Sequence, residues 1–220
     1  MELEPTVFVL DDDESFARGV DRLLCAEGFS TRTWTSVTAF LEQHDPRAPG
    51  CLLCDLVMPE MSGLELQRRL FASGCIRPVV FITGREDMNA AVEGMRAGAV
   101  SFLRKPVMRA ALIGAIGEAL VRDSISRAEH AKRLRVAALL ATLTPREHDV
   151  LDLVARGMLN KQIADKLGIA EKTIKVHRGR VMHKMQVRSA AALAHVLTDH
   201  PGSVMWYPIE CSPASLQPIA

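Results

Sequence analysis

The sequence contains no apolar stretch that approaches the ~20 residues a membrane-crossing helix needs. Apolar runs such as 51–54 and 79–82 span only a few residues. The N-terminal segment is acidic and lacks the basic and apolar parts of a signal peptide. We therefore expect a cytoplasmic protein that does not act in a membrane.

Cysteine patterns typical of disulfides or metal sites are also missing. The five cysteines form an odd set, Cys25, Cys51, Cys54, Cys75 and Cys211. Cys51 and Cys54 have C-x-x-C spacing, but the sequence has no second such pair, and both lie in an apolar, strand-like run. We expect buried, reduced thiols.

Length and charge indicate two domains with different partners. The 220 residues suit two small domains, and the 48% of apolar residues suffice for a core in each. The net charge is only +1, but residues 1–121 carry 12 basic and 17 acidic side chains, whereas residues 144–197 carry 10 basic and 5 acidic ones. The basic half is expected to bind a polyanion.

Strand-like and helix-like segments alternate in the first half. Strands are expected at Val7–Asp11, Ser30–Thr35, Cys51–Val57, Val79–Thr83 and Val100–Arg104, and helices at 15–26, 37–44, 64–72, 88–97 and from 108 onward. This alternation predicts an α/β domain, a doubly wound five-stranded parallel sheet with helices on both faces. Such sheets bind ligands beyond the carboxyl ends of their strands.

Polar side chains stand at that edge of the predicted sheet. They are Asp11, Asp12 and Asp13 after the first strand, Asp55 in the third, Thr83 at the end of the fourth, and Lys105 after the fifth. Neighbouring carboxylates repel one another unless a cation lies among them. Hard oxygen ligands beside a lysine suit Mg²⁺ and a phosphoryl group.

These residues belong to four runs, VFVLDDDES, LLCDLVMPEMSG, VVFITG and VSFLRKP. In this order they resemble the signature of receiver domains of two-component response regulators. The resemblance implies a receiver domain over 1–121 with the flavodoxin-like strand order. It identifies Asp55 as the phosphoacceptor and a phosphohistidine of a sensor histidine kinase as the donor.

The same resemblance implies a metal site and a switch. Mg²⁺, or Mn²⁺, would be bound by Asp11, Asp12, Asp55 and the backbone carbonyl of Val57. Thr83 and Lys105 would contact the phosphoryl oxygens, and Phe102 would move with Thr83 when the phosphoryl group is present. Asp13 is better interpreted as a surface acid at the start of a helix, favoured by the helix dipole.

A helical pattern continues beyond the first domain and predicts a helical linker over 122–141. Its apolar positions favour dimerisation, although a solvated, charged helix between the domains fits them equally well. The run Thr144-Pro145-Arg146-Glu147 has a capping hydroxyl, a proline at the first helical position and a glutamate at the third. A helix is therefore expected to begin there.

The segments NKQIADKLG and IAEKTIKVHRGRVMHKM predict a helix-turn-helix in an all-α domain over 142–197. On a helical wheel, Ile174, Val181 and Met185 of the longer helix face inward, and Lys172, Val176, Gly179 and His183 face outward. Six basic residues and no acid lie from Lys172 to Arg188. Such a helix suits the space between phosphate backbones.

This half resembles the LuxR-type DNA-binding domain, and the whole chain resembles the NarL/FixJ class of regulators, including regulators of aromatic-compound catabolism. The resemblance puts Lys175 and Val176 at bases and Asn160, Lys161 and Thr173 near phosphates, whereas Gly179 stands where some relatives carry a long basic side chain. We expect DNA contacts from Asn160, Lys161, Lys172, Thr173, Lys175, Val176 and Arg180.

The remaining segment, 198–220, contains four prolines and is expected to be a flexible tail, in which Trp206 and Tyr207 could dock on a domain. The chain as a whole is predicted to be a transcription regulator and not an enzyme. Phosphorylation of Asp55 would promote formation of a homodimer and binding to double-stranded promoter DNA, with RNA polymerase as a further partner.

Two alternatives stay open at this point. Asp11-x-Asp13 after a strand also suits a Mg²⁺-dependent phosphohydrolase with Asp11 as the nucleophile, although a helix-turn-helix argues against it. The chain could also be an interaction module whose basic domain binds RNA or protein and whose first domain is regulated without phosphate.

Overall fold

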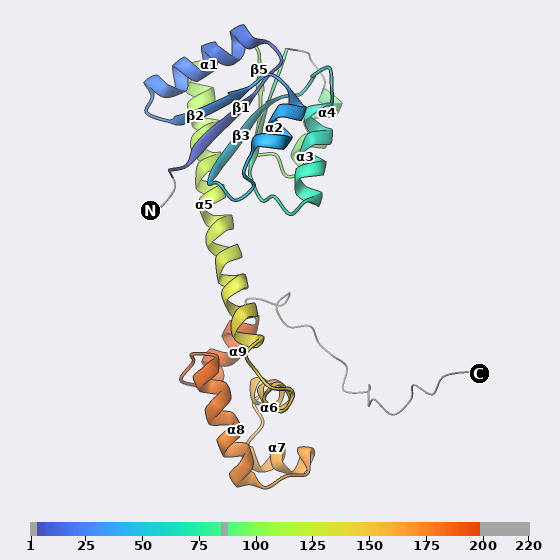
Figure 1. Cartoon of the computed structure of the whole chain (residues 1–220), viewed down its shortest axis with the longest axis vertical. Helices are drawn as coiled ribbons and strands as arrows, with labels where there is room; N and C mark the ends of the chain where they lie inside the picture. Colours follow the sequence, from blue (N-terminus) through green and yellow to red (C-terminus); the bar gives the residue numbers. More distant parts are fainter. Residues whose placement is uncertain (1–3, 85–87, 199–220) are drawn as a thin grey trace, which may run out of the picture. The chain divides into compact units, whose positions relative to one another are not determined.

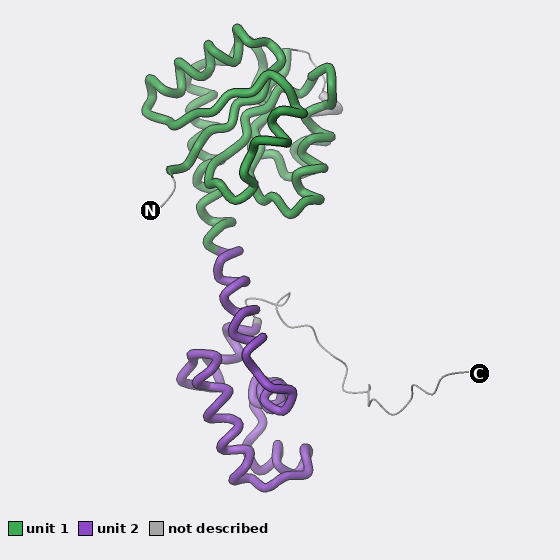
Figure 2. The backbone as a smooth tube through the Cα atoms, viewed as in Figure 1, with its two compact units in different colours: residues 1–128 green, residues 129–220 purple. Residues whose placement is uncertain are grey.

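The computed structural model describes residues 4–84 and 88–198 (Figure 1). The chain divides into two compact units, residues 1–128 and 129–220 (Figure 2). Trp206, Tyr207 and the expected flexible tail from residue 199 onward lie outside the described residues. No helix in the described part is long and apolar enough to span a membrane.

The first unit is built on a five-stranded parallel sheet in the order β2-β1-β3-β4-β5. The strands are β1 (Thr6–Leu10), β2 (Ser30–Trp34), β3 (Gly50–Asp55), β4 (Val79–Thr83) and β5 (Ser101–Arg104). This confirms the predicted doubly wound sheet and its flavodoxin-like order. Every residue of β3 and β4 is buried, as expected for central strands covered on both faces.

Helices cover both faces of the sheet (Figure 1). They are α1 (Glu14–Ala26), α2 (Val37–Gln43), α3 (Gly63–Ala72), α4 (Met88–Arg96) and α5 (Arg109–Leu140). One core joins the sheet to α2 and α3, and includes Phe40, Leu66 and Phe81. The other joins it to α1 and α5, and includes Leu24 and Ile116.

Asp13 caps the first helix. Its carboxylate accepts hydrogen bonds from the backbone N–H groups of Ser15 and Phe16, at 2.9 and 3.1 Å. An acid at this position also interacts favourably with the helix dipole. The interpretation of Asp13 as a helix-start acid is therefore confirmed.

The long helix α5 is fixed to the opposite, amino-terminal edge of the sheet by a buried acid. Asp123 is 2% exposed, and its Oδ2 accepts hydrogen bonds from the N–H of Gly50, at 2.8 Å, and from Nε of Arg127, at 2.7 Å. Arg127 also donates to the carbonyls of Arg47 and Ala48. The helix therefore holds the loop before β3 through both its acid and its base.

Gly50 has to be glycine at this place. Its φ is +137°, a backbone conformation that L side chains rarely adopt. A Cβ atom there would lie 1.8 Å from the backbone oxygen of Thr6, inside the neighbouring strand. The first residue of β3 can therefore pair closely with β1 and still donate its N–H to Asp123.

The second unit combines the end of α5 with α6 (Pro145–Ala155), α7 (Asn160–Leu167), α8 (Glu171–Lys184) and α9 (Ala190–Thr198). Its core includes Val136 and Leu140 from α5, Val150 from α6, and Ile163 and Ile174 from α7 and α8. The predicted all-α helix-turn-helix domain is confirmed.

The predicted start of α6 is observed in detail. The Thr144 hydroxyl accepts from the N–H of Glu147, at 3.3 Å, and the Glu147 carboxylate accepts from the N–H of Thr144, at 2.9 Å. Glu147 is 2% exposed and also accepts a hydrogen bond from Lys184 Nζ, at 2.6 Å. The hydrogen bond from Lys184, together with that from Thr144, lowers the pKa of Glu147 to about 2.

Removing the Asp123 carboxylate should destabilise the first unit. Asp123→Ala leaves the buried N–H of Gly50 and the Nε–H of Arg127 without their acceptor, so we expect a loss of about 1–3 kcal/mol in the free energy of unfolding. Thermal unfolding of the full chain measures this. Asp149→Ala, on the exposed side of α6, is the control, and an equal loss in both variants would contradict the assignment.

The Glu147 contact should make the second unit sensitive to acid. Because the folded-state pKa is lowered from 4.5 to about 2, the stabilisation is fully present above pH 4.5 and is lost as the pH falls toward 2. The unfolding temperature of Glu147→Gln should therefore decline less than that of the wild type over this range. Glu171→Gln, an exposed acid of α8, should decline like the wild type.

Candidate functional site

The carboxyl edge of the sheet brings together the polar residues that the sequence placed there. Leu10 pairs with Cys54 in neighbouring strands, so Asp11 and Asp55 follow side by side. Thr83, buried at 2% exposure, ends β4 opposite Arg104, and its carbonyl accepts a hydrogen bond from the N–H of Lys105 at 2.8 Å. The geometry of parallel strands therefore produces the cluster.

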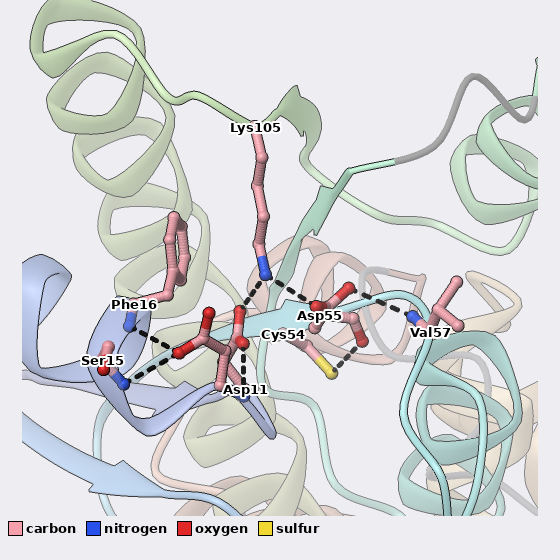
Figure 3. A network of polar contacts seen from close by, with 8 residues as sticks. Asp11, Ser15, Phe16, Cys54, Asp55, Val57 and Lys105 are labelled. Carbon is pink, nitrogen blue, oxygen red and sulfur yellow. Dashed lines mark hydrogen bonds and ion pairs between the residues drawn. The ribbon is translucent and has the colours of Figure 1, made fainter.

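Lys105 bridges the two buried carboxylates. Its Nζ lies 2.6 Å from Asp11 Oδ2 and 2.7 Å from Asp55 Oδ2 (Figure 3). The same ammonium group lies 4.1 Å from the centre of the Phe16 ring. Asp11 and Asp55 are only 2% and 8% exposed, and the single charge of Lys105 compensates one of their two negative charges.

The electrostatics of the cluster follow from burial and from this bridge. Burial raises the pKa of Asp11, and the hydrogen bond and charge of Lys105 oppose the rise. For Lys105 burial works toward a lower pKa, but the hydrogen bonds to Asp11 and Asp55 outweigh it and raise the pKa of the ammonium group. Lys105 is therefore positively charged at neutral pH.

Asp12 completes an acidic group that could hold a divalent cation. One carboxylate oxygen from each of Asp11, Asp12 and Asp55 lies within 4.8 Å of the others. Asp12 is exposed, so the group opens to solvent on one side. Three carboxylates are the hard oxygen ligands that Mg²⁺ prefers, and the residues present therefore fit such an ion. Asp13, occupied as a helix cap, is not part of this group.

The segment after β3 is positioned by Asp55 itself. The N–H of Val57 donates to Asp55 Oδ1 at 3.1 Å (Figure 3). Val57 is 48% exposed, whereas its neighbours Leu56 and Met58 are buried. The buried thiol of Cys54 donates to the carbonyl of Asp55 at 3.1 Å, so this cysteine is occupied within the core, as expected.

Phe102 lies in β5, which is separated by β4 from the strand that carries Asp55. It is partly buried and packs on the core that contains α2 and α3, with its ring centre 6.0 Å from that of Phe81. Phe81 and Phe102 are paired residues of β4 and β5, two positions before Thr83 and three before Lys105. Phe102 therefore lies on the strand that precedes Lys105 and next to the strand that ends at Thr83.

In the second unit, α8 presents a basic face. Ile174, Val181 and Met185 are buried, which confirms the inward side of the helical wheel. The exposed residues of the same helix include Lys172, Thr173, Lys175, Val176, Gly179, Arg180 and His183. Val176 is 49% exposed, a large fraction for an apolar side chain.

The two helices of the helix-turn-helix are joined by a bond that the sequence did not reveal. Arg178 Nη1 of α8 donates to Asn160 Oδ1, at 3.0 Å, at the start of α7. Asn160 therefore links the start of α7 to α8. Lys161, the next residue, is exposed.

The two parts of the chain match two family models. Residues 7–117 match the response regulator receiver domain. Residues 141–197 match the luxR family of bacterial regulatory proteins.

Curated relatives match across both parts. The response regulator protein TmoT of Ectopseudomonas mendocina is 39% identical over 194 residues, 88% of this chain and 88% of its own. The transcriptional regulatory protein FixJ of Azorhizobium caulinodans is 38% identical over 190 residues, 86% of this chain and 90% of its own.

Solved structures agree with these relatives. The response regulator StyR is 44% identical with a TM-score of 0.80, over 90% of this chain and all of that chain. Full-length FixJ from B. japonicum is 33% identical with a TM-score of 0.56, over 90% of this chain and 97% of that chain.

Proposed function

Because the chain belongs to the transcriptional response regulators of two-component systems, in the NarL/FixJ class with a receiver and a LuxR-type DNA-binding domain, we propose that phosphorylation of Asp55 controls DNA binding by α8. The observation that carries this proposal is the contact of one ammonium group, on Lys105, with the carboxylates of both Asp11 and Asp55. That arrangement gives a nucleophile, an acidic neighbour and a cation at one edge of the sheet.

Mg²⁺ would be held by Asp11, Asp12, Asp55 and the backbone carbonyl of Val57. When bound, such an ion neutralises charge on the oxygens of the transferring phosphoryl group. The three carboxylates support this assignment by their separation, and Val57 by the hydrogen bond from its N–H to Asp55, which keeps this residue beside the acidic group. Mn²⁺ offers the same ligand preference and would serve as an alternative.

The phosphoryl transfer uses the Asp55 carboxylate as the nucleophile. An Asp55 oxygen forms a bond to phosphorus while the bond from phosphorus to the imidazole nitrogen of the kinase phosphohistidine breaks. The imidazole leaves with the electron pair and takes up a proton. Lys105 lies within hydrogen-bonding distance of Asp55 and would contact an oxygen of the bound phosphoryl group.

The new group would carry about −1.5 to −2 charges close to Thr83. The Thr83 hydroxyl would donate a hydrogen bond to one phosphoryl oxygen, and Phe102 would follow the change because it lies on the adjacent strand. The surface near β5 would change in consequence, and two copies of the chain would associate. A homodimer places two α8 helices on one DNA molecule and raises its affinity for paired half-sites.

At the DNA, Lys175 and Val176 would contact base edges, and Lys172 and Arg180 would lie beside them. Asn160 and Lys161 at the start of α7, and Thr173 in α8, would lie near phosphates. This assignment is supported by the exposed, acid-free face of α8 from Lys172 onward.

The chain would be organised as two domains joined by a helix. Residues 1–121 would act as the receiver, 142–197 as the DNA-binding domain, and 122–141 as a linker whose first turns pack on the receiver and whose last turns pack on the DNA-binding domain. RNA polymerase would be a partner at the promoter. The protein would act as a regulator and not as an enzyme that turns over a substrate.

Replacing Asp55 should abolish the response to phosphate. Wild-type protein with Mg²⁺ and a small-molecule phosphodonor should gain the mass of one phosphoryl group and bind duplex DNA more tightly, whereas Asp55→Asn should do neither. Intact-protein mass spectrometry and fluorescence anisotropy measure the two effects. Asp13→Asn, which keeps its helix cap, should respond like the wild type. An equal response of Asp55→Asn would sink the proposal.

Replacing Lys175 should weaken DNA binding without affecting phosphorylation. The expected loss is about 1–3 kcal/mol of binding free energy, because a base contact disappears. Duplexes are first selected from a random-sequence pool with the wild-type protein, and the affinity of each variant for these duplexes is then measured. Lys132→Ala makes the same charge change at an exposed position of α5 and should bind almost as well. If the protein instead binds RNA more tightly than duplex DNA in the same assay, the alternative is favoured in which the basic domain binds RNA.

A further inference from the structure

One glycine on the exposed face of α8 has no structural reason to be there. Gly179 lies inside this helix, five residues before its end at Lys184, and glycine weakens a helix interior relative to alanine. Its φ is not positive, so no special backbone conformation requires it. A Cβ atom at Gly179 would meet nothing within 4 Å among the described residues, so packing within the unit does not exclude a side chain.

The neighbours of Gly179 show what lies around this gap. One turn earlier is Val176, 49% exposed, and one turn later is His183, which is also exposed. Lys175 and Arg180 flank the same face. Gly179 and Val176 are three residues apart on one exposed face of α8, and the missing side chain at Gly179 leaves the backbone uncovered beside the apolar Val176. We call this position the notch.

We propose that the notch formed by Gly179 and Val176 receives the methyl group of a thymine, with the methyl in contact with the backbone of α8 at Gly179. The C5 methyl of thymine is the apolar group that base pairs present in the major groove. A helix without a Cβ lets such a group approach the Cα atom directly. The inference rests on the proposed DNA binding by α8 and specifies which base that helix prefers.

This proposal predicts opposite effects on stability and on binding for one substitution. Gly179→Ala fills the notch with a methyl group, which strengthens the helix and occupies the place of the thymine methyl. The unfolding temperature of the second unit should rise by roughly 4 °C. The affinity for duplexes that the wild-type protein selects should fall about tenfold, which is the size of the loss expected when one base contact is removed.

The matched control is Gly114→Ala in α5. Gly114 is also exposed inside a helix, and a Cβ there would likewise meet nothing within 4 Å among the described residues. This variant should gain stability in the first unit and bind DNA like the wild type. The dependence of DNA affinity on salt concentration should be the same for the wild type, Gly179→Ala and Gly114→Ala, because neither substitution changes a charge.

The decisive measurement removes the thymine methyl from the DNA. In duplexes selected by the wild-type protein from a random pool, each thymine is replaced in turn by deoxyuridine, and affinities are compared for wild type and Gly179→Ala. At one thymine per half-site the wild type should lose affinity severalfold, whereas Gly179→Ala should lose none or recover some. This non-additivity identifies the contact.

The outcomes separate this inference from the proposed function. If the wild type selects no duplex, or if Lys175→Ala binds as well as the wild type, DNA binding by α8 itself is refuted. If Lys175→Ala weakens binding but Gly179→Ala does not, the notch is refuted and α8 remains the DNA-binding helix. Equal losses from deoxyuridine in wild type and Gly179→Ala at every position also overturn the notch.

Discussion

The first unit depends on one ammonium group that is shared by two buried carboxylates. Burial of an unpaired carboxylate costs several kcal/mol, and here two such groups end neighbouring strands of one sheet. Lys105 donates hydrogen bonds to both acids, and these bonds raise the pKa of its ammonium group in spite of its partial burial, so a positive charge stays between the two carboxylates. The residues that would hold a metal and accept a phosphoryl group are thus kept close together by the same contacts that let the sheet fold.

Sequence patterns predicted the cluster because parallel strands end at a common edge. Apolar runs gave the strand positions to within one or two residues, and the polar residues at their ends then had to converge. The expected start of α6 and the inward face of α8 followed in the same way from local rules on caps and periodicity. What these features share is that neighbours in the chain determine them.

The contacts that sequence patterns missed all join distant segments. Asp123 and Gly50 are 73 residues apart, Glu147 and Lys184 are 37 apart, and Asn160 and Arg178 are 18 apart. Each uses a residue type that is common on helix surfaces, so nothing local distinguishes it from a solvated side chain. Asp123 in particular lies in a stretch that looks like a solvated, charged helix, and only the packing of α5 against the loop before β3 reveals its burial.

The bond between Asp123 and Gly50 also decides where the chain can be cut. An end at residue 121, where the receiver-like pattern stops, would remove the acid that holds the first residue of β3 and the arginine that holds the preceding loop. An isolated first half should therefore keep α5 as far as Ala128, where the compact unit ends. Fusions that replace the DNA-binding half by another protein gain a natural junction within α5, directly after that residue.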